Sequence, residues 1–297
     1  LGHLVHMPSH TYYRIGRWEK SLNANIAAVA ADEAYIAKGS VSAPYLYGYY
    51  PHNIHFAMTT ALMAGKGDVA LEMAEKMKTA LPMLGDASEP YAEWMAASYY
   101  QIALHFMTPE AVLDLPKPKA THPFLVASWH YARGEAFARL GKADDAMAEA
   151  KIVEAFATSE AIAAFDVAHI PGADILETAS LIVKARSLAA SGDLKAAIAA
   201  MEQAVIAQGK IPYTEPPFWY YPTRQSLAAL VLQDGQLDRA EALFYETLVE
   251  SPNNAWALYG LYETFTAKKE KAAAKYAKKL FEDAWMGGKT LPKVEQL

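Results

Sequence analysis

The chain has 297 residues, of which 53% are hydrophobic, and its 27 Lys and Arg against 33 Asp and Glu give a formal net charge of −6. So much apolar sequence excludes intrinsic disorder as the main state, and the acidic balance argues against a nucleic-acid-binding protein, which usually carries a basic face. There is no cysteine, which excludes disulfides, thiolate zinc sites and cysteine catalysis.

The chain begins at Leu1, without an initiator Met and already inside a motif, so we expect it to be a piece of a longer protein. No secretory leader is visible. The longest uncharged stretch, 39–65, contains two prolines and several polar side chains, so we expect no membrane span. These features predict a soluble protein and leave its compartment open between the cytoplasm and, after export, the periplasm.

Five copies of one pattern follow along the chain: an apolar helix, a loop with Gly, and a second helix with a small residue five positions after that Gly. Gly allows the chain to turn at positive φ after the first helix, and the small residue lets the two helices approach closely. The sequence therefore predicts an all-α protein built of antiparallel helix pairs. The loop glycines and small residues are Gly16 and Ser21, Gly65 and Ala70, Gly141 and Ala146, Gly192 and Ala197, and Gly235 and Ala240.

Two further elements are expected outside this pattern. A degenerate sixth pair near 89–120 would fill the longest gap between the loop glycines, with several prolines interrupting its second half. The C-terminal helix carries Lys268, Lys271, Lys275 and Lys278 opposite Tyr276, Leu280 and Ala284, which is typical of a capping helix with a solvated face.

Five of the nine histidines fall in two short motifs on predicted first helices. His6 and His10 are four residues apart, and His52 and His55 are three apart, so each pair shares a helix face. Such spacing can chelate one metal ion. When the two repeats are aligned on their loop glycines, His3 matches His52 and His6 matches His55. The motifs are HLVHMPSH, with His3, His6 and His10, and PHNIHF, with His52 and His55.

Neutral imidazoles favour zinc, copper, iron or nickel over magnesium or calcium, so a transition metal is the expected cofactor. A carboxylate such as Glu93 could complete the shell, and an open position could activate water. Two alternatives stay open: a hydrogen-bonding or proton-handling pocket without metal, and histidines with no shared role. No phosphate loop or dinucleotide fingerprint is present, so no nucleotide cofactor is expected.

A second motif, 213–224, reads YTEPPFWYYPTR and cannot form a helix at its paired prolines. Glu215, Trp219, Tyr220 and Arg224 gather polar and amphipathic groups in this short space. One interpretation is a rim or lid that contacts a ligand. The other is a plug between repeats, with Arg224 paired to Glu215 or to a neighbour.

The strings GHLVHMPSHTYYRIGRW, YYPHNIHFAM, YTEPPFWYYPTRQSL and SPNNAWALYGL resemble a group of bacterial tetratricopeptide-repeat (TPR) proteins that have no assigned reaction. The resemblance covers nearly all of 1–297 and implies one right-handed α-solenoid. In TPR proteins the first-helix positions matched by the five histidines, Tyr13 and Arg14 line a concave groove. The resemblance therefore implies a histidine-lined groove and a peptide or protein partner.

Three functions are consistent with these features. The first is a TPR-type binding or scaffold protein whose groove carries a transition-metal site. The second is a metal-dependent hydrolase or oxidase that uses the same cluster. The third is a purely structural assembly subunit, whose interfaces the 18 tyrosines could supply.

Overall fold

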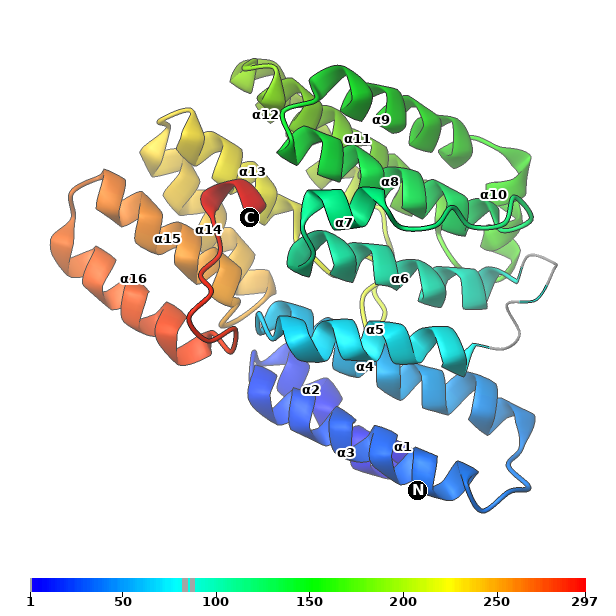
Figure 1. The fold of residues 1–297 in the computed structure, drawn as a ribbon. Helices are drawn as coiled ribbons and strands as arrows, with labels where there is room; N and C mark the ends of the chain where they lie inside the picture. The colour runs from blue at the N-terminus through cyan, green and yellow to red at the C-terminus, as the bar shows by residue number, and fades with distance from the viewer. Residues whose placement is uncertain (1, 82–84, 86–88) are drawn as a thin grey trace. The chain divides into compact units, whose positions relative to one another are not determined.

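The computed structural model describes residues 2–81, 85 and 89–297; Leu1, at the start of the sequence, lies outside this part. Every regular element in the described part is helical, and neighbouring helices pack in pairs (Figure 1). This confirms the all-α prediction. The chain divides into two compact units, residues 1–82 with 237–297, and residues 83–236.

The first unit combines helices from both ends of the sequence. Its N-terminal helices pack in the order α1 and α2 on α3, α3 on α4, and α4 on α5, while α14, α15 and α16 pack in chain order. The elements are α1 (Gly2–His6), α2 (Pro8–Arg14), α3 (Trp18–Ile36), a π-helical turn (Tyr45–Tyr49), α4 (Tyr50–Met63), α5 (Gly67–Ala80), α14 (Leu237–Glu250), α15 (Ala255–Ala267), α16 (Lys271–Ala284) and a 3₁₀ turn (Val294–Gln296).

The second unit has α8, α9, α11 and α12 as its best-packed helices, with α6 against α8 and α13 against α12. The degenerate pair corresponds to α6 and the single-turn α7. The elements are α6 (Pro90–Phe106), α7 (Pro109–Leu113), α8 (Pro123–Arg139), α9 (Ala143–Ala157), α10 (Glu160–Val167), α11 (Gly172–Ala190), α12 (Leu194–Gln208) and α13 (Thr223–Gln233).

The five loop glycines behave as the sequence predicts. All have positive φ, from +66° at Gly16 to +87° at Gly192. In each loop the residue after the glycine donates its N–H to a carbonyl five residues earlier, as Arg17 does to Tyr12 at 2.8 Å, which closes the helix end. The small residues five positions later are all fully buried, as expected where paired helices pack together: Ser21, Ala70, Ala146, Ala197 and Ala240.

Contacts between distant parts of the sequence close the first unit. The Trp18 indole donates to the Asn253 carbonyl at 2.8 Å, and the Trp256 indole donates to the Leu62 carbonyl at 3.0 Å. The chain after α16 also returns to the α4–α5 turn, where the Met286 N–H donates to the Ala64 carbonyl at 2.8 Å. Local repeat patterns contain no information about these contacts.

The C-terminal helix α16 presents the predicted lysine face, but two residues differ from the prediction in their exposure. Lys271, Lys275 and Lys278 are exposed, whereas Lys268 is largely buried among Asp238, Glu241 and Glu270. Tyr276, expected on the packed face, is 64% exposed. The other two predicted members, Leu280 and Ala284, do pack against the cluster on α15, and buried Ala277 and Phe281 complete this face.

Candidate metal centre

The histidines of the first motif lie on two short helices because Pro8 interrupts the backbone ladder. Pro8 has no N–H to continue it. The Met7 N–H still bonds to the His3 carbonyl at 3.1 Å, and the His10 N–H then bonds to the Met7 carbonyl in a tighter turn at 3.3 Å. The chain nevertheless keeps a helical course, so His6 at the end of α1 and His10 in α2 stay on one face.

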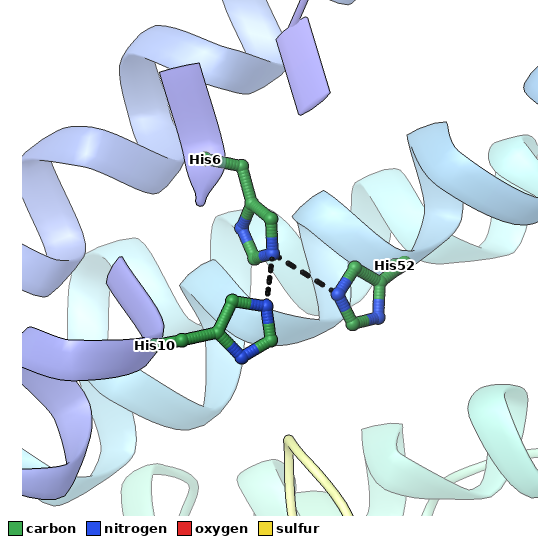
Figure 2. A group of neighbouring side chains, drawn as sticks. All are labelled: His6, His10 and His52. Carbon is green, nitrogen blue, oxygen red and sulfur yellow. Dashed lines mark hydrogen bonds between the residues drawn. The ribbon is translucent and has the colours of Figure 1, made fainter. Parts of the chain in front are cut away.

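Three histidines meet between α1, α2 and the first turn of α4 (Figure 2). The His6 Nε2 lies 2.8 Å from the His10 Nε2 and 3.1 Å from the His52 Nε2. One nitrogen from each ring lies within 4.8 Å of the others, close enough to hold a metal ion. Two imidazole nitrogens bound tetrahedrally at about 2.0–2.1 Å from zinc would be about 3.3 Å apart, so the trio needs only small side-chain adjustments.

A buried amide sets the tautomer of the central imidazole. The Asn25 side chain on α3 donates its NH₂ to the Ser21 carbonyl at 2.9 Å, which leaves its oxygen facing the His6 Nδ1 at 2.6 Å. That oxygen can only accept, so the His6 Nδ1 carries the proton and the Nε2 carries the lone pair. Buried Ser9 lies near the same Nδ1, at 3.1 Å. In many metal sites a carbonyl or carboxylate that accepts from the other ring nitrogen orients a histidine ligand in this way.

Hydrogen bonds between the rings make His6 share one nitrogen between two neighbouring histidines. The His6 Nε2 has a single lone pair and faces two other imidazole nitrogens. It can accept a strong hydrogen bond from only one of them. A transition-metal ion can instead accept a lone pair from each of the three rings. This arrangement favours a metal ligand set over a proton-sharing cluster.

Burial keeps the α4 imidazoles neutral. Desolvation, followed by the positive charge that His6, His55 and His10 would carry, lowers the pKa of His52 from 6.5 to about 3. Desolvation alone lowers the pKa of His55 to about 3. The neutral imidazole is the form that ligates metals, so His52 is in the ligating state throughout the physiological pH range.

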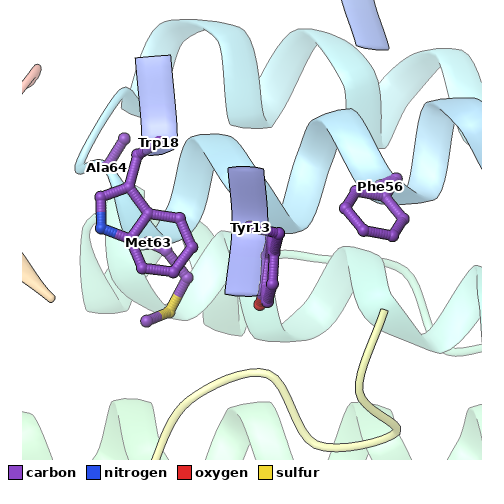
Figure 3. Close-up of a cluster of buried hydrophobic side chains, with 5 residues drawn as sticks. All are labelled: Tyr13, Trp18, Phe56, Met63 and Ala64. Atoms are coloured by element: carbon purple, nitrogen blue, oxygen red, sulfur yellow. The ribbon is translucent and has the colours of Figure 1, made fainter. Parts of the chain in front are cut away.

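The side chains that pack beneath the three histidines are apolar. Phe56, fully buried one turn after His52, lies with its ring centroid 5.0 Å from that of His6 and 4.7 Å from that of His10. It belongs to a cluster with Tyr13, Trp18, Met63 and Ala64 (Figure 3). Tyr13 was expected to line a groove; its ring is instead 7% exposed and packs edge-on against Phe56, at 5.3 Å between ring centroids. Arg14 is exposed.

Two of the five predicted ligands lie outside the trio. His55 is buried, and its three-residue spacing from His52 turns it about 60° around α4, so Phe56 rather than His55 lies beneath the trio. His3 lies beside the trio, with its ring centroid 5.7 Å from that of His6 and 4.4 Å from that of Tyr49. Its Nδ1 is buried and has no hydrogen-bond partner.

Glu93, considered as a further ligand, lies in the second unit, where it caps the start of another helix. Its fully buried carboxylate accepts the backbone N–H groups of Phe124 and Leu125 at 3.0 and 3.3 Å, at the start of α8. It also lies 3.5 Å from His122. Here a carboxylate from another helix satisfies the first N–H groups of α8, which have no partner within their own helix.

The 213–224 motif also belongs to the second unit. Trp219 and Tyr220 are buried, whereas Glu215 accepts a hydrogen bond from the Tyr213 hydroxyl in an exposed stretch. Arg224 is half-buried at the start of α13. The aromatic residues of the motif thus form part of the core of this unit.

A buried polar network behind the trio was not anticipated from the sequence. The fully buried Asp32 accepts hydrogen bonds from the Tyr45 hydroxyl and, at 2.7 Å, from the Asn53 side chain. Gly2 packs against the same carboxylate, where a Cβ would lie 1.9 Å from the Asp32 oxygen. This network fixes α1 and α4 on α3. In the sequence, the only sign of this network is that Asp32 is a polar residue at a position of α3 that faces the core. Asn25 is a second such residue on the same helix.

No protein-family model matches the chain, and no curated protein shows significant sequence similarity to it. Among the helices that the structure describes, none has both the length and the apolar character needed to cross a bilayer.

Proposed function

We propose that the protein is a helical-repeat binding protein that holds a transition-metal ion with His6, His10 and His52. The observation that carries the proposal is the meeting of three Nε2 atoms, with the central ring held in the ligating tautomer by Asn25. Zinc fits best, because three neutral imidazoles form one of its known ligand sets. Copper and iron are the other candidates.

The scaffold in this proposal is a TPR-like right-handed solenoid whose concave face binds a peptide or protein. Its support is the recurrence of a positive-φ loop glycine followed five residues later by a fully buried small residue. Repeats of this kind stack into extended concave surfaces suited to a partner.

Metal content tests the proposal. Protein produced without a histidine tag is stripped with a chelator, loaded with Zn²⁺, desalted and analysed by elemental mass spectrometry. We expect about one zinc per chain in the wild type and a loss to background in His10→Ala and His52→Ala, because each removes one of three ligands. Both side chains are partly exposed, so truncation leaves no sealed cavity.

The matched control is His169→Asn, which removes an exposed histidine from a position with φ of +57° that Asn tolerates. It should keep the wild-type zinc content. Wild-type protein that retains no metal, or trio variants that retain it while folded by circular dichroism, would refute the metal site and favour a structural assembly subunit.

A second candidate is a metal-dependent hydrolase or oxidase. The observation in its favour is that His10 and His52 are partly exposed, so a metal held by three protein ligands would keep a further position for water or substrate. Hydrolysis of an activated ester by zinc-loaded wild type, absent from His52→Ala, would support the hydrolase. Equal background rates in both proteins would leave binding as the function.

A further inference from the structure

The first two helices expose an apolar stripe on the side opposite to the one that they pack into the first unit. The packed side holds the buried residues of both helices: Gly2, His6, Ser9 and Tyr13. Leu4, Met7 and Ile15 form the stripe and are 69%, 45% and 50% exposed. Their spacings of three and eight residues place them on one side of a helix, about half a turn away from the packed side.

Such a stripe is unusual on a helix that is open to solvent. A surface helix normally turns its apolar side to the core and carries polar side chains on the opposite side. In helical-repeat proteins neighbouring repeats cover one another's apolar faces, and a face left to water is polar. No helix in the described part of the chain covers Leu4, Met7 and Ile15. The stripe therefore has the character of an interface for another helix.

The charges at the end of the stripe are mainly positive. Residues 2–18 contain Arg14 and Arg17 and no acidic residue, and Lys20 follows in the first turn of α3. All three basic side chains belong to exposed residues. Glu19, which is also exposed, offsets one of these three charges. A partner that covers the stripe therefore gains from acidic side chains beside its own apolar side.

The stripe leads into an open groove at Ile15. This groove lies within the first unit, between the α2–α3 turn and the end of α16, and has a volume of about 610 Å³, a size typical of ligand sites. Arg17 and Lys20 line one side of it. The apolar residues of the other side are Leu280, Ala284 and Met286. Asp283 on that side is already paired with Lys279, at 2.5 Å. The groove thus extends the stripe with further apolar surface and two basic side chains.

We propose that the stripe and the groove bind a partner protein through an amphipathic helix with acidic flanks. Recognition of this kind places the apolar side of the partner helix on an apolar surface. The acidic residues of the partner face Arg14, Arg17 and Lys20. A second copy of the chain that used the same stripe would bring like charges together, so charge disfavours a symmetric dimer. The surface is separate from the metal centre, because His6 is on the packed side of α1.

The test is fluorescence anisotropy with a labelled synthetic helix of Leu and Ala, flanked by Glu, and with its counterpart that has Lys at every Glu position. We expect the acidic peptide to bind about 10-fold more tightly, or better, because like charges oppose the lysine peptide. Met7→Gln and Ile15→Gln should each weaken the acidic peptide roughly 10-fold, because each removes an apolar contact. Both side chains are about half exposed, so the core stays intact.

The matched control is Val249→Gln on α14 of the same unit. It removes an apolar side chain that is 82% exposed and lies outside the stripe and the groove. It should change the affinity for the acidic peptide less than about 2-fold. Wild type stripped of metal with a chelator should bind this peptide as the zinc-loaded protein does, so failure here and failure of the metal site are separate results.

Three results of the anisotropy experiment would overturn the proposal: no binding of the acidic peptide to the wild type, equal affinity for the two peptides, or equal loss in Ile15→Gln and Val249→Gln. Sedimentation supplies a fourth. A wild type that sediments as a dimer and becomes a monomer in Ile15→Gln would show that a second copy covers the stripe, which would refute a partner helix.

Discussion

Closure of the first unit depends on how the chain after α16 meets the α4–α5 turn, and Gly65→Ala tests this contact. A Cβ at Gly65 would lie 2.1 Å from the Trp285 ring, far inside the ordinary separation of about 3.5–4.0 Å. The ring or the turn must therefore move by more than 1 Å in the variant.

Gly39→Ala is the matched control in the same unit. Gly39 has a φ of +77° and Gly65 a φ of +72°, and a Cβ at Gly39 meets no atom within 4 Å. Both variants incur the cost of a left-handed Ala, roughly 1–2 kcal/mol. Only Gly65→Ala adds an overpacking cost, roughly 1–3 kcal/mol. The difference between the variants isolates the Trp285 contact.

The assay is urea and thermal unfolding followed by far-ultraviolet circular dichroism. We expect Gly65→Ala to lower the free energy of unfolding by about 1–3 kcal/mol more than Gly39→Ala. For a cooperative unit of this size, this corresponds to a further decrease in Tm of about 2–4 °C per kcal/mol. Equal destabilisation by the two substitutions would show that Trp285 does not pack on this turn.

Three further predictions concern the metal centre, the core and the second unit. Asn25→Leu, which keeps the approximate side-chain size and removes the acceptor, should lower zinc affinity roughly 10- to 100-fold if the amide orients His6 as a ligand, measured by competition with a chromophoric chelator; unchanged affinity would rule out that orienting role. Ser21→Leu should destabilise by about 1–3 kcal/mol in urea unfolding, because this fully buried position has no room for a larger side chain; wild-type stability would show that the helices do not approach there. Burial alone would raise the pKa of Glu149, but hydrogen bonds from His130 and Arg133 outweigh burial and lower it. A lowered folded-state pKa contributes stability above the unfolded-state value, about 4.3, that is lost as pH falls through the folded-state pKa. Glu149→Gln should therefore be destabilised at pH 7 and approach the wild type as pH falls well below 4; a pH-independent difference would refute the ion-pair explanation.

The sequence determined the local architecture. Each loop glycine was identifiable because only glycine takes a positive φ without strain, and each small residue because two helices approach where a side chain is short. The histidine pair at 6 and 10 was also identifiable, because helical periodicity alone places residues four apart on one face.

Tertiary structure decided which side chains share a site. His52 reaches His6 although 46 residues separate them, whereas His55, one of the predicted ligands, turns into the core because α4 is buried on nearly all sides. The orienting Asn25 lies on α3, a fourth helix that carries none of the three histidines, and no local pattern encodes its partner. The contact of Trp18 with Asn253 spans 235 residues. Such contacts depend on how packed helices are arranged in space, and helical periodicity specifies only the face of each helix, not the neighbour that covers it.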